Sequence, residues 1–282
     1  MDVAQSARLG WGLLGAAAAA WFAVWFLFFP QFVPDSFAWN IQPRFAQLFI
    51  GAGYVFRTFF FLNAAFERSW VRLRWIVWGN LVFTGVLLFA TYWHAGDFHW
   101  NPFETPLAHI WIVLYVFEPV VMIYLIPRGT LSATPPVSGG PINIWFKRFL
   151  VLVTGLLLMN GLLLLLNPEF AATRWAWELN PMDARIVSAW FLGWSVWCGT
   201  MAFAQDWDEI RTAARLFVLN GVALLAVTVL YSNEFLPGRG TATGFAVALA
   251  VGTGVMAAFH VLQERRRPTD RPEPGELGGV AG

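Results

Sequence analysis

Apolar residues run through most of this chain in long, nearly unbroken stretches that are separated by short polar segments. A helix needs roughly 20 such residues to cross about 30 Å of hydrocarbon. The stretches that meet this length cover residues 10–29, 43–64, 75–93, 107–126, 149–166, 183–204, 213–231 and 242–262. Helices are expected because a helix in lipid satisfies its own backbone hydrogen bonds. The pattern predicts an all-α integral membrane protein with eight transmembrane helices.

The composition agrees with a membrane location and excludes several classes of soluble protein. Apolar residues make up 58% of the chain and charged residues only 12%, with a mean hydropathy of +0.57; soluble domains carry about 25% charged residues. The 17 Trp and 27 Phe residues are typical of proteins that contact bilayer interfaces. No basic patch is interleaved with aromatic residues, so no nucleic-acid partner is expected. The lipid bilayer is the expected partner.

Two segments of the chain resemble each other without a gap. Residues 30–46 and residues 168–184 share six of seventeen positions, which are Pro30/Pro168, Phe32/Phe170, Ala38/Ala176, Trp39/Trp177, Pro43/Pro181 and Ala46/Ala184. Such similarity at a fixed offset is the mark of an internal repeat. We expect spans one to four to correspond to spans five to eight.

The basic residues predict how the spans are oriented. Thirteen of the eighteen Lys and Arg residues fall at the span ends that share a side with the two termini. The positive-inside rule therefore predicts a multi-pass protein of the cell membrane with cytoplasmic N- and C-termini. The first apolar stretch is interpreted as a retained span, because its alanine run precedes most of its apolar bulk. Since each half crosses an even number of times, the two repeats are expected to lie parallel.

This organisation divides the chain into four parts. Residues 1–127 form the first four-helix repeat and residues 148–263 the second. Between them, residues 128–147 are rich in Pro and Gly and are interpreted as a cytoplasmic linker. The charged, Pro/Gly-rich residues 264–282 are expected to be a disordered cytoplasmic tail.

The repeated segment places a tryptophan and a proline before the second span and again before the sixth. These are Trp39 with Pro43 and Trp177 with Pro181. A helix tolerates proline in its first turn, and an indole at headgroup depth keeps its N–H in water and its ring in lipid. We expect helix starts with interfacial anchors. The alternative is that the two segments form the mouth of a shared cavity.

Two opposite charges lie inside the predicted spans of the first half. Glu118 is expected roughly 12 Å deep in the fourth span and Arg57 roughly 10 Å deep in the second. An unpaired carboxylate at this depth would cost several kcal/mol or stay protonated, so an ion pair is expected. The repeat aligns Arg57 with Ser195, and a looser match of the last spans places Glu118 near Gly252, so only one half has the pair. It is interpreted as a substrate-binding or proton-coupling site, with a structural pair or no contact as alternatives.

A second candidate site lies between the third and fourth spans, on the side away from the termini. It contains His94, Asp97, His99 and His109, with Glu104 beside them. Imidazole and carboxylate groups suit Zn, Fe or Mn, and two histidines on neighbouring helices can hold a haem. The spacing matches no recognised zinc motif. A loop of hydrogen-bonded or solvated histidines is the simpler interpretation.

No motif in the chain names a reaction, so only its architecture indicates a function. The favoured interpretation is a carrier or binder of a small apolar or weakly anionic solute, held between the two repeats at Arg57 and Glu118. One alternative is a subunit of a larger membrane complex with membrane-protein partners. The other is a membrane enzyme that uses a metal or haem at the external His/Asp site. No cofactor is expected under the first two interpretations.

Overall fold

The computed structural model describes residues 3–67, 69–103, 106–131, 139–236, 238 and 240–267. Within these residues it is entirely helical, without a strand, and the eight predicted spans are confirmed as eight long apolar helices. These are α1 (Val3–Phe28), α3 (Arg44–Phe66), α4 (Trp70–Trp93), α5 (Leu107–Leu131), α6 (Ile144–Leu166), α8 (Pro181–Phe203), α9 (Trp207–Leu230) and α10 (Gly240–Arg266). The chain is a multi-pass α-helical membrane protein.

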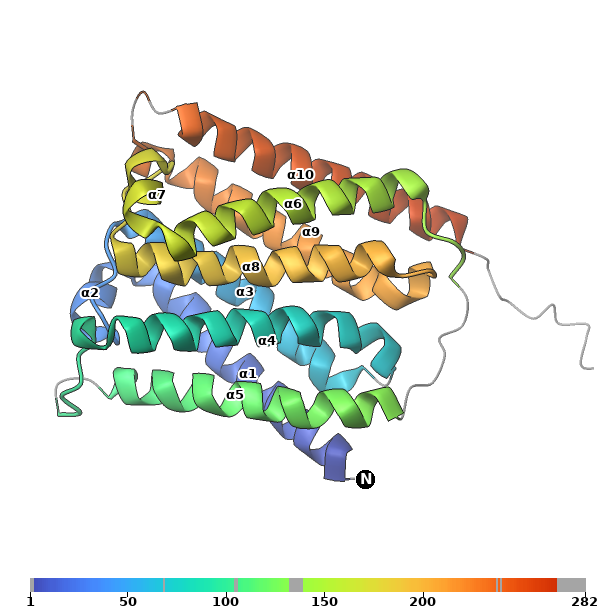
Figure 1. The fold of residues 1–282 in the computed structure, drawn as a ribbon, viewed down its shortest axis with the longest axis horizontal. Helices are drawn as coiled ribbons and strands as arrows, with labels where there is room; N and C mark the ends of the chain where they lie inside the picture. The colour runs from blue at the N-terminus through green and yellow to red at the C-terminus, as the bar shows by residue number, and fades with distance from the viewer. Residues whose placement is uncertain are drawn as a thin grey trace, which may run out of the picture.

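Short helices connect the long ones at one end of the bundle. They are η1 (Pro30–Phe32), α2 (Val33–Ser36), η2 (Ala95–Asp97), α7 (Pro168–Arg174) and η3 (Ser232–Glu234). Figure 1 shows α2 and α7 together at this end, which we call the loop end. The start of α1 and the end of α10 lie at the other, which we call the terminal end (Figure 1).

Helices α4 and α9 are among those that begin earlier than the hydropathy pattern predicts. The apolar stretches suggested starts near residues 75 and 213, whereas α4 begins at Trp70 and α9 at Trp207. The added turns carry charged residues that pair across the two helices at the terminal end, Arg72 with Asp208 and Arg74 with Glu209. Because these charges neutralise each other, the helices continue beyond the apolar segment.

The predicted linker and tail are described only in part. Helix α5 continues to Leu131 and α6 begins at Ile144, so both helices extend into the expected linker 128–147. Residues 132–138 lie outside the described residues. Helix α10 runs to Arg266, and residues 268–282 of the expected tail also lie outside the described part of the chain.

The bundle has two central helices and a periphery. In α3 and α8, 78% of the most apolar stretch is buried, against 17% in α6 and 6% in α10. Helix α1 packs along α3, and α6 packs along α8. Helices α4 and α5 pair with each other, as do α9 and α10. The contacts α3–α9 and α4–α8 join the two halves, with α6 and α10 on the outside (Figure 1).

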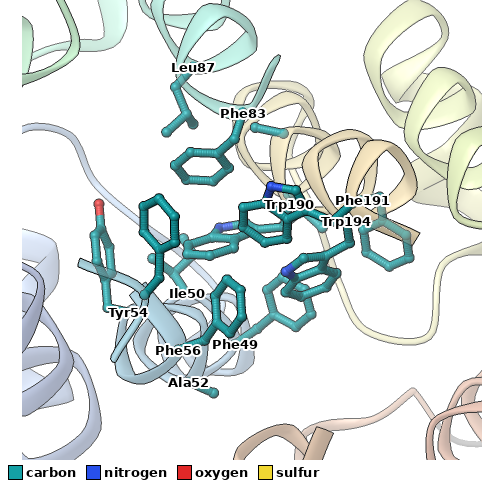
Figure 2. Close-up of a cluster of buried hydrophobic side chains, with 14 of the residues drawn as sticks. Phe49, Ile50, Ala52, Tyr54, Phe56, Phe83, Leu87, Trp190, Phe191 and Trp194 are labelled. Carbon is teal, nitrogen blue, oxygen red and sulfur yellow. The ribbon is translucent and has the colours of Figure 1, made fainter. Parts of the chain in front are cut away.

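Aromatic rings fill the junction between the halves. Figure 2 shows Trp190 and Trp194 of α8 among side chains of α3 and α4. The ring centroids of Trp190 and Phe83 lie 4.4 Å apart. A Cβ at Gly53 would lie 2.6 Å from the Trp190 ring, so this glycine lets the indole approach the α3 backbone. The junction is therefore a tightly packed aromatic layer.

The two repeated tryptophans are part of this core. Trp39 is 1% exposed and Trp177 is 0% exposed, so the expected contact of both indoles with lipid and water is wrong. The Trp39 N–H donates to Asp183 Oδ1 over 3.1 Å, while the Trp177 ring packs on Phe45 at 4.8 Å. Each indole thus contacts the start of a central helix in the other half. Burial against a partner replaces the lipid contact that the sequence suggested.

Candidate functional site

The structure brings Arg57 and Glu118 together inside the first half. Arg57 Nη2 lies 2.6 Å from Glu118 Oε1, and both residues are buried, at 2% and 6% exposure. Asn80 of α4 completes the cluster, because its Oδ1 accepts from Arg57 Nη1 at 2.6 Å and its Nδ2 donates to Glu118 Oε1 at 2.6 Å. Helices α3, α4 and α5 each supply one member of a closed polar triangle.

Apolar and aromatic groups surround this triangle. The guanidinium carbon of Arg57 lies 4.4 Å from the ring centroid of Phe83 and 4.8 Å from that of Phe61. Cation–π contacts of this kind strengthen when water is excluded. Next to the triangle the hydroxyls of Tyr54 and Tyr115 lie 2.7 Å apart. The cluster is satisfied internally apart from Arg57 Nε, which has no partner.

The cavity beside the triangle is small. It holds about 50 Å³ and is lined by Arg57, Glu118, the two tyrosines and a face of α1 around Gly15. A water molecule occupies about 30 Å³ in the liquid, so a space of this size suits water rather than an organic solute. The geometry supports a buried ion pair with a neighbouring water site.

His94 of the loop-end cluster is held by two partners. Its Nδ1 lies 2.9 Å from Asp97 Oδ2, and its Nε2 lies 2.6 Å from Arg185 Nη1 of α8. Because arginine only donates, Nε2 accepts and Nδ1 carries the proton that it donates to Asp97. The lone pair that a metal would need is thus engaged by Arg185.

The other residues of that cluster point to separate partners. His99 Nδ1 lies 3.0 Å from the carbonyl oxygen of Phe37, and His109 packs edge-on against Trp100. Over the described residues, no three His, Cys, Asp or Glu side chains gather closely enough to hold a metal. Glu104 lies outside that part of the chain. A metal or haem at this end stays a prediction.

The second half contains a much larger cleft. It has a volume of about 500 Å³ and lies among α6, α8, α9 and α10. Its walls are mainly apolar, with Phe149 and Met256 towards the terminal end and Trp175 and Thr241 towards the loop end. The spacing of Thr241 and Met256 along α10 corresponds to roughly 22 Å of helix. The volume lies in the range of small-molecule sites, about 300–1,000 Å³.

Another hollow of about 560 Å³ lies on the outer side of α4 and α5 near the loop end. Its lining includes Tyr92, which is 82% exposed, and Phe89, which is 43% exposed. Such exposed side chains form a surface depression that lipid tails can fill. The cleft of the second half is therefore the better candidate for a solute site.

Asp208 is a buried carboxylate that the sequence analysis did not single out. It is 0% exposed, and three arginines surround it at the terminal end: Arg72 donates to Oδ2, while Arg211 Nε and Arg267 Nη2 lie 3.0 Å and 3.2 Å from Oδ1. Residues 205–209 (QDWDE) hold three acidic residues next to a predicted span, and this local concentration of charge could have indicated an ionic cluster. The cluster ties α4, α9 and the end of α10 together.

The cleft was also missed by sequence reasoning, and for a physical reason. Most of its lining residues are ordinary apolar residues of the spans, and the packing of the peripheral helices leaves the space between them. The small residues Gly244, Ala248 and Gly252 recur every four positions along α10, a spacing that is typical of close helix packing. A Cβ at Gly244 or Gly252 would instead meet nothing within 4 Å.

Comparisons with protein-family models, with curated proteins and with solved structures give no match to this chain.

Proposed function

We propose that this protein binds a small apolar or weakly anionic solute within the membrane and acts as its carrier. The cleft of about 500 Å³ in the second half carries the proposal. An apolar space of that size, bordered by two peripheral helices, can take up a solute directly from hydrocarbon. The solute site proposed here lies within the second half, since aromatic rings fill the junction between the halves.

We also propose that the two halves are parallel repeats with cytoplasmic termini. Matched contacts support the repeats: His99 N donates to Ala38 O at 2.8 Å, and Leu236 N donates to Ala176 O at 3.1 Å, with the two alanines at aligned positions. The basic residues at the terminal end support the orientation. Tagging each end for accessibility in intact cells tests it, since an externally labelled terminus would contradict the proposal.

The proposed repeat relates the cleft to the ionic cluster of the first half. After a two-residue insertion it aligns Asn80 with Asn220, and by a looser match it places Glu118 near Gly252; both second-half residues line the cleft. Ser195, aligned with Arg57, donates to the carbonyl of Leu192 in its own helix at 2.7 Å. The ionic cluster occupies this position in the first half, whereas smaller and neutral residues border the cleft at the corresponding position of the second half. That Glu118 also couples solute binding to a proton stays a prediction.

A cleft-filling substitution tests the solute site. Gly252→Leu adds a large side chain at a cleft-lining position where a Cβ meets nothing within 4 Å. Gly254→Leu is the matched control, because it lies on the same helix, also faces open space and does not line the cleft. We expect Gly252→Leu to reduce binding of radiolabelled hexadecane and hexadecan-1-ol by the protein in nanodiscs at least about tenfold. Equal binding by both variants and the wild type would contradict the proposed function.

A further inference from the structure

One end of the large cleft carries a positive charge. Of the described residues that line the cleft, Arg174 alone is charged, and none is acidic. Arg174 is the last residue of α7, and Ala171, three residues earlier in the same helix, also lines the cleft. Residues three apart share one face of a helix, so Arg174 lies on the face of α7 that borders the cleft. The loop end of the cleft is therefore cationic.

The guanidinium of Arg174 is available to a ligand. The residue is exposed, and it forms no ion pair with an acid of the described part of the chain. Its guanidinium carbon lies 5.1 Å from the ring centroid of Phe170. A ring contact of this kind uses the face of the guanidinium, whereas the N–H donors point outwards from its edge. That edge can bind a carboxylate through two parallel hydrogen bonds.

Away from this charge the cleft is long and mainly apolar. Its lining extends along α10 from Thr241 at the loop end to Met256, which corresponds to roughly 22 Å of helix. Beyond Met256, towards the terminal end, the rings of Phe146 and Phe259 pack with their centroids 5.1 Å apart. A space of this shape suits one extended alkyl chain that starts at the loop end and ends near Met256.

We propose that the solute is a long-chain monocarboxylate, with its carboxylate at Arg174 and its alkyl chain along the cleft. The cationic end and the apolar walls complement the two parts of such a molecule. Because Arg174 is exposed, the carboxylate keeps contact with water and no anion is desolvated inside the membrane. This assignment rests on the proposed function, since it names the solute class of the same cleft.

The single arginine also limits the charge of the ligand. A carboxylate carries one negative charge, which Arg174 balances. A phosphate monoester carries about 1.5 to 2 negative charges at pH 7 and would need a second cation. The described lining of the cleft does not contain one. An alcohol or an alkane would leave Arg174 without a counterion, so neither makes use of the charge.

Three probes that share one alkyl chain and differ in the headgroup separate these ligands. They are palmitate, hexadecan-1-ol and hexadecyl phosphate, and binding of each is measured at low and high salt on the full-length protein in nanodiscs of zwitterionic lipid. Arg174→Gln removes the charge, whereas Arg174→Lys retains it. Arg44→Gln is the matched control. Arg44 is also exposed at the loop end and its guanidinium carbon also lies 5.1 Å from a ring centroid, that of Tyr231, but it does not line the cleft.

We expect Arg174→Gln to weaken palmitate binding about fivefold, which is the scale of one exposed ion pair, and to leave hexadecan-1-ol binding unchanged. Arg174→Lys should lose less palmitate affinity than Arg174→Gln, and Arg44→Gln should change neither probe. High salt should weaken palmitate binding to the wild type more than to Arg174→Gln, because it screens the exposed pair.

Equal palmitate affinity of the wild type and Arg174→Gln, with loss of palmitate and hexadecan-1-ol in Gly252→Leu, would overturn the carboxylate assignment while the proposed function stands. An equal loss in Arg174→Gln and Arg44→Gln would overturn it in favour of a general charge effect at the loop end. Hexadecyl phosphate that binds more tightly than palmitate and loses more in Arg174→Gln would overturn it in favour of a phosphate headgroup. Insensitivity of every probe to Gly252→Leu would remove the cleft and the proposed function with it.

Discussion

Trp197 of α8 occupies the space in front of Gly79 of α4. A Cβ at position 79 would lie 1.8 Å from Trp197 Cδ1, and the indole N–H donates to the carbonyl of Ile76 at 2.6 Å. The ring is 2% exposed and also packs on Phe56 of α3 at 4.9 Å. One indole thus joins the two halves of the bundle, and it depends on the absence of a side chain at position 79.

The first prediction follows from that contact. Gly79→Ala should lower the free energy of unfolding by about 2–3 kcal/mol, because the added methyl displaces a ring that is fixed by its own hydrogen bond. Thermal unfolding in detergent micelles measures the change. Gly85→Ala is the control, since it lies on the same helix and its Cβ would meet nothing within 4 Å. Equal unfolding midpoints for the two variants would show that the indole moves freely.

The buried ion pair yields the second prediction. Glu118→Gln should destabilise the protein by about 3–5 kcal/mol if the carboxyl is ionised, because Arg57 then keeps a buried charge without a countercharge. The double variant Arg57→Leu/Glu118→Leu should lose less than Glu118→Gln alone. Unfolding midpoints of the wild type and these variants test this order. An unchanged midpoint for Glu118→Gln would mean that the wild-type carboxyl is protonated, which would favour the proton-coupling interpretation.

The third prediction contrasts two ion pairs at the terminal end. Asp208→Asn should lower the free energy of unfolding by about 3 kcal/mol, because it removes the buried carboxylate that pairs with Arg72, Arg211 and Arg267. Glu209→Gln should cost under about 1 kcal/mol, since its partner Arg74 has a side chain that is 38% exposed. Limited proteolysis near α9, together with unfolding midpoints, measures both. Equal losses would contradict the difference in burial on which this prediction rests.

The fourth prediction concerns the two buried indoles of the repeated segment. Trp39→Phe removes the donor to Asp183, a 0% exposed carboxylate, and should cost about 1–3 kcal/mol. Trp177→Phe removes an N–H that has no partner, so its cost should be smaller and come from lost packing alone. Comparing the unfolding midpoints tests the difference. A larger loss in Trp177→Phe would show that ring packing outweighs the hydrogen bond.

The long helices were predictable because a membrane span is recognised from the hydropathy of about twenty consecutive residues, so single polar residues do not hide it. The approach of Arg57 to Glu118 also followed from similar depth and from the cost of an unpaired charge in hydrocarbon. Burial of Trp39 and Trp177 was not predictable in this way, because an aromatic residue near a span end suits lipid and protein contacts equally well. Only the packing of α3 against the other half decides between them.

The cleft shows a further limit of sequence reasoning. Small residues such as Gly244, Ala248 and Gly252 allow a neighbouring helix to pack closely, but they equally leave an open space when no helix approaches. What decides is the distance between α6 and α10, which depends on Phe146 and Phe259 packing at 5.1 Å near the terminal end. Such long-range packing leaves no pattern in the local sequence.

The position of the cleft between two outer helices changes what controls its occupancy. A ligand that enters from the side comes from the hydrocarbon phase of the bilayer. Its mole fraction in the bilayer therefore sets how much of the cleft is occupied. Its concentration in water matters only because it sets how much of the ligand partitions into the bilayer. Phospholipid tails, present in vast excess, are then permanent competitors. Selectivity over those tails has to come from the few polar atoms in the wall, and apparent affinities measured in detergent and in bilayers will differ with the amount of lipid.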